Sequence, residues 1–150
     1  MQDDQANFVD TVTTLARRFR TLLDQELAPE DLTYARARIL FHLKNGRSAN
    51  QRGLSAALGL EPPSVVRLVD DLERLSLITR QEDPTDRRAK LLVLTTVGEA
   101  SAQRADLIAR RLSTRLLDAL STSEVELVSS LLSRLSTRAA TVNGEALPNT

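Results

Sequence analysis

Arginine and short polar side chains occur at two places in the middle of the chain where their spacing suits contacts with a nucleic acid. Ser64 and Arg67 lie three positions apart just after Pro62-Pro63, so a helix beginning there presents both in its first turns. Such an arginine can donate two hydrogen bonds to O6 and N7 of guanine, a contact that discriminates between bases by about 1–3 kcal/mol. The alternative is a solvated helix face, and the acidic neighbours Asp70 and Asp71 agree with it.

The second place is a polar connection between two short apolar stretches, residues 77–81 and 91–95, a pattern that predicts a β-hairpin. Its tip carries Asp86, Arg87 and Arg88. A guanidinium there can enter the minor groove, whose negative potential attracts it. Asp86 is placed to hold the Arg88 side chain in one rotamer. A surface ion pair contributing less than about 1 kcal/mol is the alternative that spacing leaves open.

Helices must position both sites. Apolar residues recur at steps of three and four from Phe8 to Leu23 and predict one amphipathic helix up to Leu27, ended by Pro29. The same reasoning predicts five further helices, at residues 33–43, 50–58, 62–75, 96–120 and 121–140. The apolar side of the helix at 62–75 includes Leu75.

Local signals mark where these helices begin and end. Asn45-Gly46 and Gly59 suit left-handed residues that end helices. Capping-box spacing predicts the starts of three helices, at the pairs Ser48 with Gln51, Thr96 with Glu99, and Ser121 with Glu124. Two short helices joined at Gly59 and followed by a hairpin have the arrangement of a winged helix-turn-helix. The predicted fold class is mainly α with a small β-hairpin wing.

Composition excludes several functions. The 150 residues contain no cysteine and one histidine, His42, so thiol chemistry, a tetrahedral metal site and an acid–base catalytic set are not expected. We therefore expect no enzyme, no cofactor and no metal. No apolar run reaches the roughly 18 residues of a membrane span, and the acidic start lacks signal-peptide features. The expectation is a cytoplasmic protein with no membrane partner.

Charge is distributed unevenly although the net charge is zero. Residues 36–95 carry eleven Lys and Arg against seven Asp and Glu, whereas residues 1–35 carry three against seven. This modest basic excess is a weak indication of nucleic-acid binding when taken alone.

The segment from Pro63 to Gln81, followed by residues 83–95 and Gly98, resembles the MarR family of bacterial transcription regulators, and its SlyA branch looks closest. The Asp86-x-Arg88 element with its trailing Leu94-Thr95 carries much of the resemblance, and the helix order fits residues 6–140. Where related proteins often have glycine this chain has Ser76, which places a serine in a left-handed turn.

The resemblance implies a homodimer whose terminal helices interlock. It assigns residues 1–32 and 96–140 to a helical dimerisation region, 33–95 to the DNA-binding lobe and 141–150 to a disordered tail. The partner is double-stranded DNA with a near-palindromic operator. Ser64 and Arg67 become base or phosphate contacts, and Arg88 the minor-groove residue oriented by Asp86. The other predicted DNA-contacting residues are Ser48, Gln51, Pro63, Arg80 and Arg87.

The resemblance also implies a small, often aromatic and anionic effector that releases DNA, which would make the protein a repressor. Phe19, Tyr34, Arg36 and Arg38 lie on the two helices that would line its pocket. A core aromatic residue beside surface arginines is the commoner explanation of this pattern. The main rival hypothesis for the whole chain is a winged-helix module that docks a protein through its charged face and binds no DNA.

Overall fold

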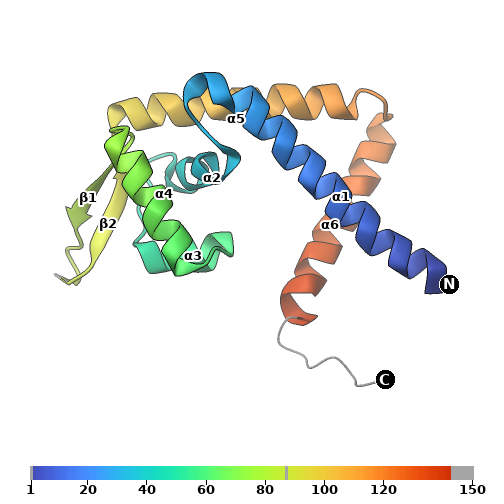
Figure 1. Cartoon of the computed structure of the whole chain (residues 1–150), viewed down its shortest axis with the longest axis horizontal. Helices are drawn as coiled ribbons and strands as arrows, with labels where there is room; N and C mark the ends of the chain where they lie inside the picture. The colour runs from blue at the N-terminus through green and yellow to red at the C-terminus, as the bar shows by residue number, and fades with distance from the viewer. Residues whose placement is uncertain (1, 87, 143–150) are drawn as a thin grey trace. The chain divides into compact units, whose positions relative to one another are not determined.

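The computed structural model describes residues 2–86 and 88–142, with side chains described from residue 7 onward. Figure 1 shows the order of its elements. They are α1 (Gln2–Leu27), η1 (Ala28–Glu30), α2 (Tyr34–Leu43), α3 (Gln51–Leu58), α4 (Pro62–Arg74), β1 (Ile78–Glu82), β2 (Lys90–Leu94), α5 (Thr96–Leu117) and α6 (Thr122–Val142). The predicted fold class is confirmed, because the only strands in the described residues form one antiparallel hairpin among helices.

Hydroxyl and amide side chains determine where several helices begin. Thr33 accepts a hydrogen bond from the Arg36 N–H at 3.3 Å and caps α2. Ser121 Oγ accepts from the Glu124 N–H at 3.4 Å while the Glu124 carboxylate accepts from the Ser121 N–H at 2.8 Å. This reciprocal pair is the capping box predicted at the start of α6.

The other two predicted capping boxes are wrong, each by one or two residues. Asn50, not Ser48, caps α3, because its Oδ1 accepts from the Gly53 N–H at 2.7 Å. Thr95, not Thr96, caps α5, because its Oγ1 accepts from the Gly98 N–H at 2.9 Å. In both places two suitable residues lie close together in sequence. Asn50 directly follows Ala49, which is bonded to Leu92 of the hairpin, and the Thr95 N–H donates to the Leu77 carbonyl after α4.

A single aliphatic core joins α2, α3, α4 and the hairpin. Its fully buried large side chains are Leu27 at the end of α1 and Ile39, Leu40, Leu43, Leu54, Val65, Val69, Leu72, Ile78 and Leu92. Burying such side chains contributes about 1.5–3 kcal/mol each. Residues 91–94 are all apolar, and buried Leu92 identifies the inward face of β2. Leu75 was predicted to face inward but is 39% exposed, because α4 ends at Arg74 and Leu75 is its C-cap.

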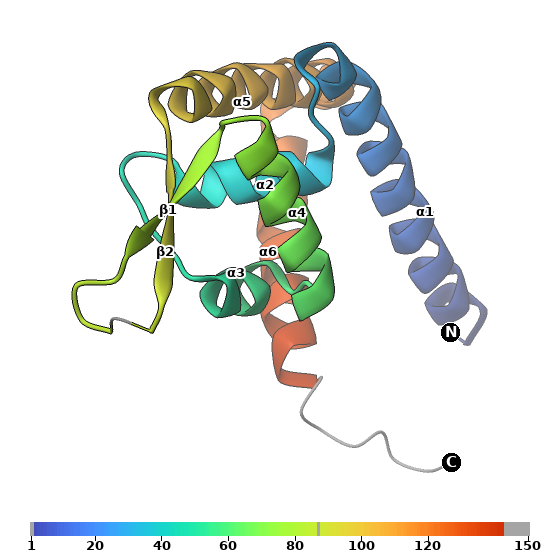
Figure 2. The same ribbon diagram turned by 60° about the vertical axis from the view of Figure 1, so that its left-hand side comes forward.

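The hairpin is tied to the segment before α3. Its register pairs Ile78 with Leu94 and Glu82 with Lys90. β1 thus begins and ends one residue later than predicted, and β2 begins and ends one residue earlier. Ala49 then exchanges both main-chain hydrogen bonds with Leu92, at 2.8 and 3.3 Å. Figure 2 shows the hairpin extending away from the helices to its tip. The start of α3 and the base of the hairpin are therefore held together.

Ser76 adopts the left-handed conformation that its position predicted, with φ of 57°. Its N–H donates to the Glu73 carbonyl at 2.9 Å in the turn between α4 and β1. Glycine adopts this conformation without the Cβ clash, so Ser76→Gly is expected to raise the free energy of unfolding by about 0.5–1 kcal/mol. Urea denaturation measures the change. Ser76→Ala, which keeps the Cβ, should give no such gain, and equal effects of the two substitutions would contradict this explanation.

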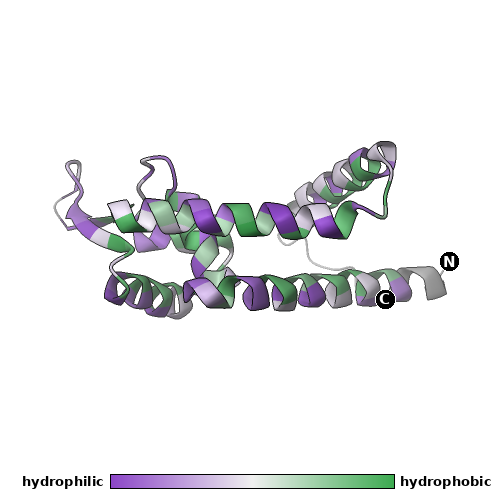
Figure 3. Ribbon diagram, turned by 90° about the horizontal axis from the view of Figure 1, so that it is seen from above, coloured by the Kyte–Doolittle hydropathy of each residue, from purple (hydrophilic) through white to green (hydrophobic). Residues whose placement is uncertain are grey.

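The chain divides into two compact units, residues 1–110 and 111–150. Within them, α1 and α6 carry rows of exposed apolar side chains. On α1 these include Phe8, Val12, Leu15 and Phe19, and on α6 they include Leu127, Val128, Leu131, Leu132 and Leu135. Figure 3 shows hydrophobic and hydrophilic positions alternating along α1. The core of residues 27–105 leaves these rows uncovered.

The last helices differ from the prediction at their ends. α5 ends at Leu117 instead of residue 120, and α6 continues to Val142, two residues into the segment predicted as a tail. Residues 143–150 of that segment lie outside the described part of the chain. None of the described helices is both long enough and apolar enough to cross a membrane.

Candidate nucleic-acid interface

α3 and α4 are joined by a tight turn at Gly59. Gly59 has φ of 60° and ends α3, as predicted. The turn is closed from both sides, because the Leu60 N–H donates to the Ser55 carbonyl at 3.1 Å and the Ser55 hydroxyl donates to the Leu60 carbonyl at 2.6 Å. The small hydroxyl at residue 55 thus fixes the angle at which the chain enters α4.

The outward side of α4 carries the predicted base-contacting residues. Val65 and Val69 are buried in the core, whereas Pro63 and Arg67 are exposed and Ser64 is half-buried. Ser64 and Arg67 both line a hollow of about 370 Å³. In the part of the chain that the structure describes, the Arg67 guanidinium has no ion pair. It is therefore available to a ligand.

The first turn of α4 has few free amides. Pro62 and Pro63 have no N–H group, and the N–H groups of Ser64 and Val65 both donate to the Glu61 carbonyl, at 2.9 and 3.1 Å. A helix N-terminus binds anions through unpaired N–H groups. Contacts from this end of α4 must therefore come from side chains.

A basic hollow lies instead between the start of α3 and the hairpin. It has a volume of about 360 Å³ and is lined by Asn50, Gln51, Arg52, Arg80, Arg88, Ala89, Lys90 and Leu92. Four of these side chains are cationic and the lining contains no acidic residue, although Lys90 pairs with the exposed Glu82 at 3.4 Å outside the lining. The Ala49–Leu92 bridge brings the two elements together. Gln51, Arg80 and Arg88 were predicted site residues, whereas the sequence analysis missed Arg52 and Lys90, whose only signal is their positive charge.

Arg80 has a role that its sequence position does not show. It was predicted to contact phosphate, but its Nη2 lies 2.7 Å from Asp70 Oδ1 and its Nη1 pairs with the Glu73 carboxylate. One guanidinium from β1 is thus held by two carboxylates of α4. This contact fixes the hairpin relative to α4. It also pairs the Asp70 carboxylate, which would otherwise be an unpaired negative charge on the outward side of α4.

The hairpin tip is shaped by two aspartates that accept main-chain hydrogen bonds. Asp83 Oδ1 accepts from the Thr85 hydroxyl at 2.6 Å and from its N–H at 2.8 Å. These bonds lower the pKa of Asp83 below its ordinary value of 3.8, the hydroxyl contributing most, so the carboxylate stays charged at neutral pH. Asp86 Oδ1 accepts from the Arg88 N–H at 2.9 Å.

The contact of Asp86 corrects one prediction. We expected its carboxylate to hold the Arg88 side chain, but it holds the Arg88 main chain. A carboxylate two residues before an N–H group closes a local turn readily, which is why this geometry forms. The exposed Arg88 guanidinium has no ion pair within residues 7–86 and 88–142. Arg87 lies outside the described residues, and Ser48 is exposed in the loop before α3.

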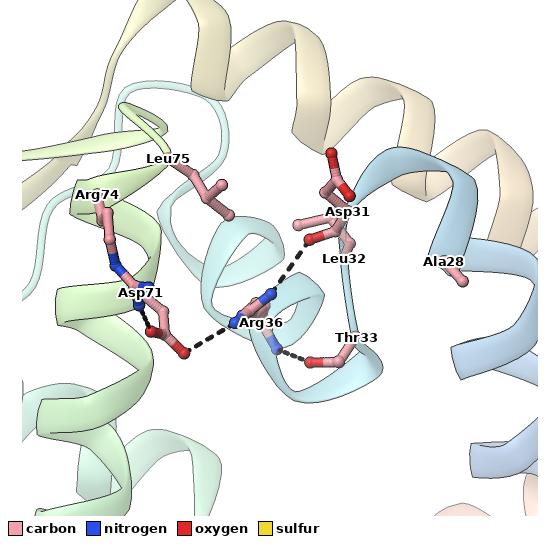
Figure 4. Close-up of a pocket in the computed structure, with 8 residues that line it drawn as sticks. All are labelled: Ala28, Asp31, Leu32, Thr33, Arg36, Asp71, Arg74 and Leu75. Atoms are coloured by element: carbon pink, nitrogen blue, oxygen red, sulfur yellow. Dashed lines mark hydrogen bonds and ion pairs between the residues drawn. The ribbon is translucent and has the colours of Figure 1, made fainter.

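Of the four residues predicted to bind an effector, Arg36 lines the hollow described next and the other three do not. Arg36 lines a separate hollow of about 490 Å³ between η1, α2 and α4, together with Asp71 and Arg74. Its Nη2 pairs with Asp71 Oδ2 at 2.8 Å and its Nη1 donates to the Asp31 carbonyl at 3.2 Å, as Figure 4 shows.

The other three members of that set lie elsewhere. Arg38 donates to the Leu58 carbonyl at 2.6 Å, the Tyr34 N–H donates to Asp24 at 2.6 Å, and Phe19 is 39% exposed on α1. None of the three lines the hollow around Arg36. Among the described residues, no group of three or more His, Asp or Glu side chains could hold a metal ion.

Comparison with known proteins agrees with this geometry. Residues 30–89 match the model of the MarR family. The fold is similar to that of a mutant MarR from E. coli complexed with operator DNA, with a TM-score of 0.80, 23% identity and coverage of 89% of this chain and 96% of that one.

Two further structures are similar at slightly higher identity. The S. aureus MepR–DNA complex gives a TM-score of 0.78 and 26% identity, covering 87% of this chain and 97% of that one. A probable transcriptional regulator from Pseudomonas aeruginosa gives 0.77 and 27%, covering 90% and 99%. The chain therefore shares the winged-helix fold of these structures.

Proposed function

We propose, from the match of residues 30–89 to the model of the MarR family, that the protein is a sequence-specific transcription regulator of this family that binds double-stranded DNA as a homodimer. The observation that carries the proposal is the basic hollow between α3 and the hairpin, which Arg80 connects to α4, together with Arg67 on α4, which has no ion pair among the described residues. Two of the similar structures, those of MarR and MepR, contain DNA.

Each part of this surface has a task in the proposed complex. α4 enters the major groove, where Arg67 contacts a guanine and Ser64 and Pro63 approach base edges or the backbone. The hairpin crosses the backbone so that Arg88 reaches the minor groove. Arg52 and Lys90 neutralise phosphate in the basic hollow.

The first turn of α3 adds a second phosphate contact. Gln51 and Arg52 occupy its first two positions, and their amides face no capping side chain, because Asn50 caps through Gly53. Ser48 lies in the loop just before this turn. Arg87 belongs to the same basic tip by its sequence position. Arg80, held by Asp70 and Glu73, orients the hairpin and contributes its charge to the hollow.

In this proposal the terminal helices form the contact with a second copy of the chain. Residues 1–32 and 96–140 form the dimerisation region, and the exposed apolar rows of α1 and α6 support this assignment, because a soluble monomer rarely leaves such long apolar rows in water. Dimer symmetry then implies two half-sites whose centres are about one helical turn apart.

The finer assignments rest on the hairpin sequence and on the hollow around Arg36. We place the protein in the SlyA-like branch and in the cytoplasm, where a bacterial chromosome is accessible. We also propose that it represses transcription until a small, aromatic and anionic molecule binds. Arg36 and Arg74 line this hollow together with Asp31 and Asp71, and both arginines pair with Asp71, so a carboxylate of the effector would take the place of the Asp71 carboxylate. The effector releases DNA only if it binds one arrangement of the lobes better than the other.

Selection from a random duplex pool tests the function directly. The full-length protein should enrich a near-palindromic sequence, and the affinity for it should fall steeply as salt rises, with log K decreasing by about 0.9 per phosphate contact for each unit of log salt. Duplexes selected in this way also serve for effector competition with aromatic carboxylates. If no sequence is enriched and affinity is indifferent to salt, the protein-docking hypothesis is favoured instead.

A further inference from the structure

One apolar side chain of α4 is exposed where the fold gives no reason for it. Val66 is 41% exposed, although its neighbour Val65 is fully buried. Among the described residues, every other large apolar side chain that is exposed, except Leu75, lies within residues 8–19 or 97–135. Those ranges belong to the terminal helices. Val66 therefore belongs neither to the core nor to the proposed dimerisation region.

The surroundings of Val66 place it on the part of α4 that faces DNA in the proposed complex. Pro62 and Pro63, four and three residues earlier, are exposed on the same side of the helix. Arg67 is the next residue and has no ion pair in the part of the chain described. Asp70, four residues later, is held by Arg80. The first two turns thus present an apolar patch beside a free guanidinium.

The chemistry of this patch selects one kind of partner group. Because Pro62 and Pro63 have no N–H and the next two amides are bonded to Glu61, this end of the helix offers no hydrogen-bond donors from its backbone. The C5 methyl of thymine is the apolar group that the major groove presents. An exposed valine gains from contact with it and gains nothing from a polar base edge.

We propose that Val66 is a specificity-determining residue that contacts the C5 methyl of a thymine near the guanine bound by Arg67. The two side chains are adjacent on one helix, so the two base pairs lie within about two steps of each other. This inference rests on the proposed function and adds to it the identity of one base in each half-site.

Replacing thymine by deoxyuridine tests the contact, because it removes only the methyl group. With the duplex selected by the full-length protein, each thymine of the half-site is replaced in turn. One position should lower the affinity about fourfold, and roughly fifteenfold when it is replaced in both half-sites. With Val66→Ala this thymine-to-uridine ratio should fall to about one, while the uridine duplex is bound nearly as before.

Val97→Ala is the matched control, because it makes the same change at a valine that is 58% exposed at the start of α5. It should leave the thymine-to-uridine ratio unchanged. Because residue 97 lies in the proposed dimerisation region, sedimentation should show that the dimer persists in both variants, and thermal unfolding should show that both fold. If no thymine is sensitive, or if the ratio survives in Val66→Ala, the inference is wrong although the protein still binds its duplex. If no duplex is enriched, the proposed function fails and this inference fails with it.

Discussion

Replacing Gly98 by alanine is expected to lower the free energy of unfolding by about 3 kcal/mol. Gly98 is buried in the first turn of α5, and a Cβ added to it would lie 1.8 Å from the Leu77 carbonyl oxygen and 2.8 Å from the carbonyl carbon. Both are backbone atoms, so no side-chain rotation relieves the clash. α5 would have to move away from the turn that follows α4.

That movement would also break hydrogen bonds. The Leu77 carbonyl accepts from the Thr95 N–H at 3.0 Å and from its hydroxyl at 3.3 Å, and Thr95 in turn caps α5. Urea and thermal denaturation measure the loss, with an expected decrease in Tm of about 6–12 °C for a chain of this size. The effect is a large part of the 5–15 kcal/mol typical of natural domains.

Gly53→Ala is the control for this prediction. Gly53 lies in α3 without positive φ, and an added Cβ would approach only the end of the Asn50 side chain, at 3.3 Å. Alanine has the higher helix propensity, so stability should stay unchanged or rise by up to about 1 kcal/mol. Equal losses in the two variants would show that the contact between α5 and Leu77 is not what requires glycine at residue 98.

Element order and helix ends could be predicted because their causes are local. Pro29 ends α1, Gly59 ends α3 and Pro62 begins α4, and each acts through the backbone of its own turn. The caps of α3 and α5 could not be chosen from sequence. Asn50 follows the residue bridged to Leu92, and Thr95 donates to the Leu77 carbonyl, so contacts with distant residues decided between neighbouring candidates.

In the candidate site, too, some residues could be identified from the sequence, whereas contacts between distant elements could not. Arg67 and Arg88 could be identified from helical spacing and from the hairpin pattern. The pairing of Arg80 with Asp70 and Glu73 depends on the packing of β1 against α4, which no spacing rule contains. The exposure of Val66 likewise depends on how α4 rotates on the core. The Asp86 contact was missed because two acceptable donors, one main-chain and one side-chain, belong to the same residue, Arg88.

Removing the Arg88 side chain is expected to weaken duplex binding about a hundredfold. The guanidinium is exposed, has no ion pair among the described residues and lines the basic hollow, so no internal contact is lost when it is removed. A charged hydrogen bond to DNA contributes about 1.5 kcal/mol, which corresponds to somewhat more than tenfold. The proposed homodimer has two hairpins, so the factor is squared.

Titration of the selected duplex with Arg88→Ala measures this effect at two or more salt concentrations, and sedimentation measures whether the proposed dimer persists in the variant. Arg104→Ala removes the same charge from α5, where Arg104 pairs with Glu30, and should change affinity little. Arg88→Lys keeps the charge but not the planar guanidinium, so it distinguishes an effect of the positive charge from an effect of the guanidinium geometry.

The three variants together decide how Arg88 acts. If it enters the minor groove, Arg88→Ala and Arg88→Lys should both lose the preference for A·T over G·C pairs beneath the hairpin tip, because a narrow A·T groove attracts guanidinium most strongly. If it binds only phosphate, Arg88→Lys should retain most of the affinity, and Arg88→Ala should reduce the salt slope by about two per dimer without any change in base preference. If Arg88→Ala bound the duplex with wild-type affinity, the hairpin would not be part of the interface. The Asp86 carboxylate accepts from the residue 88 main chain, so this hydrogen bond can form in both Arg88 variants.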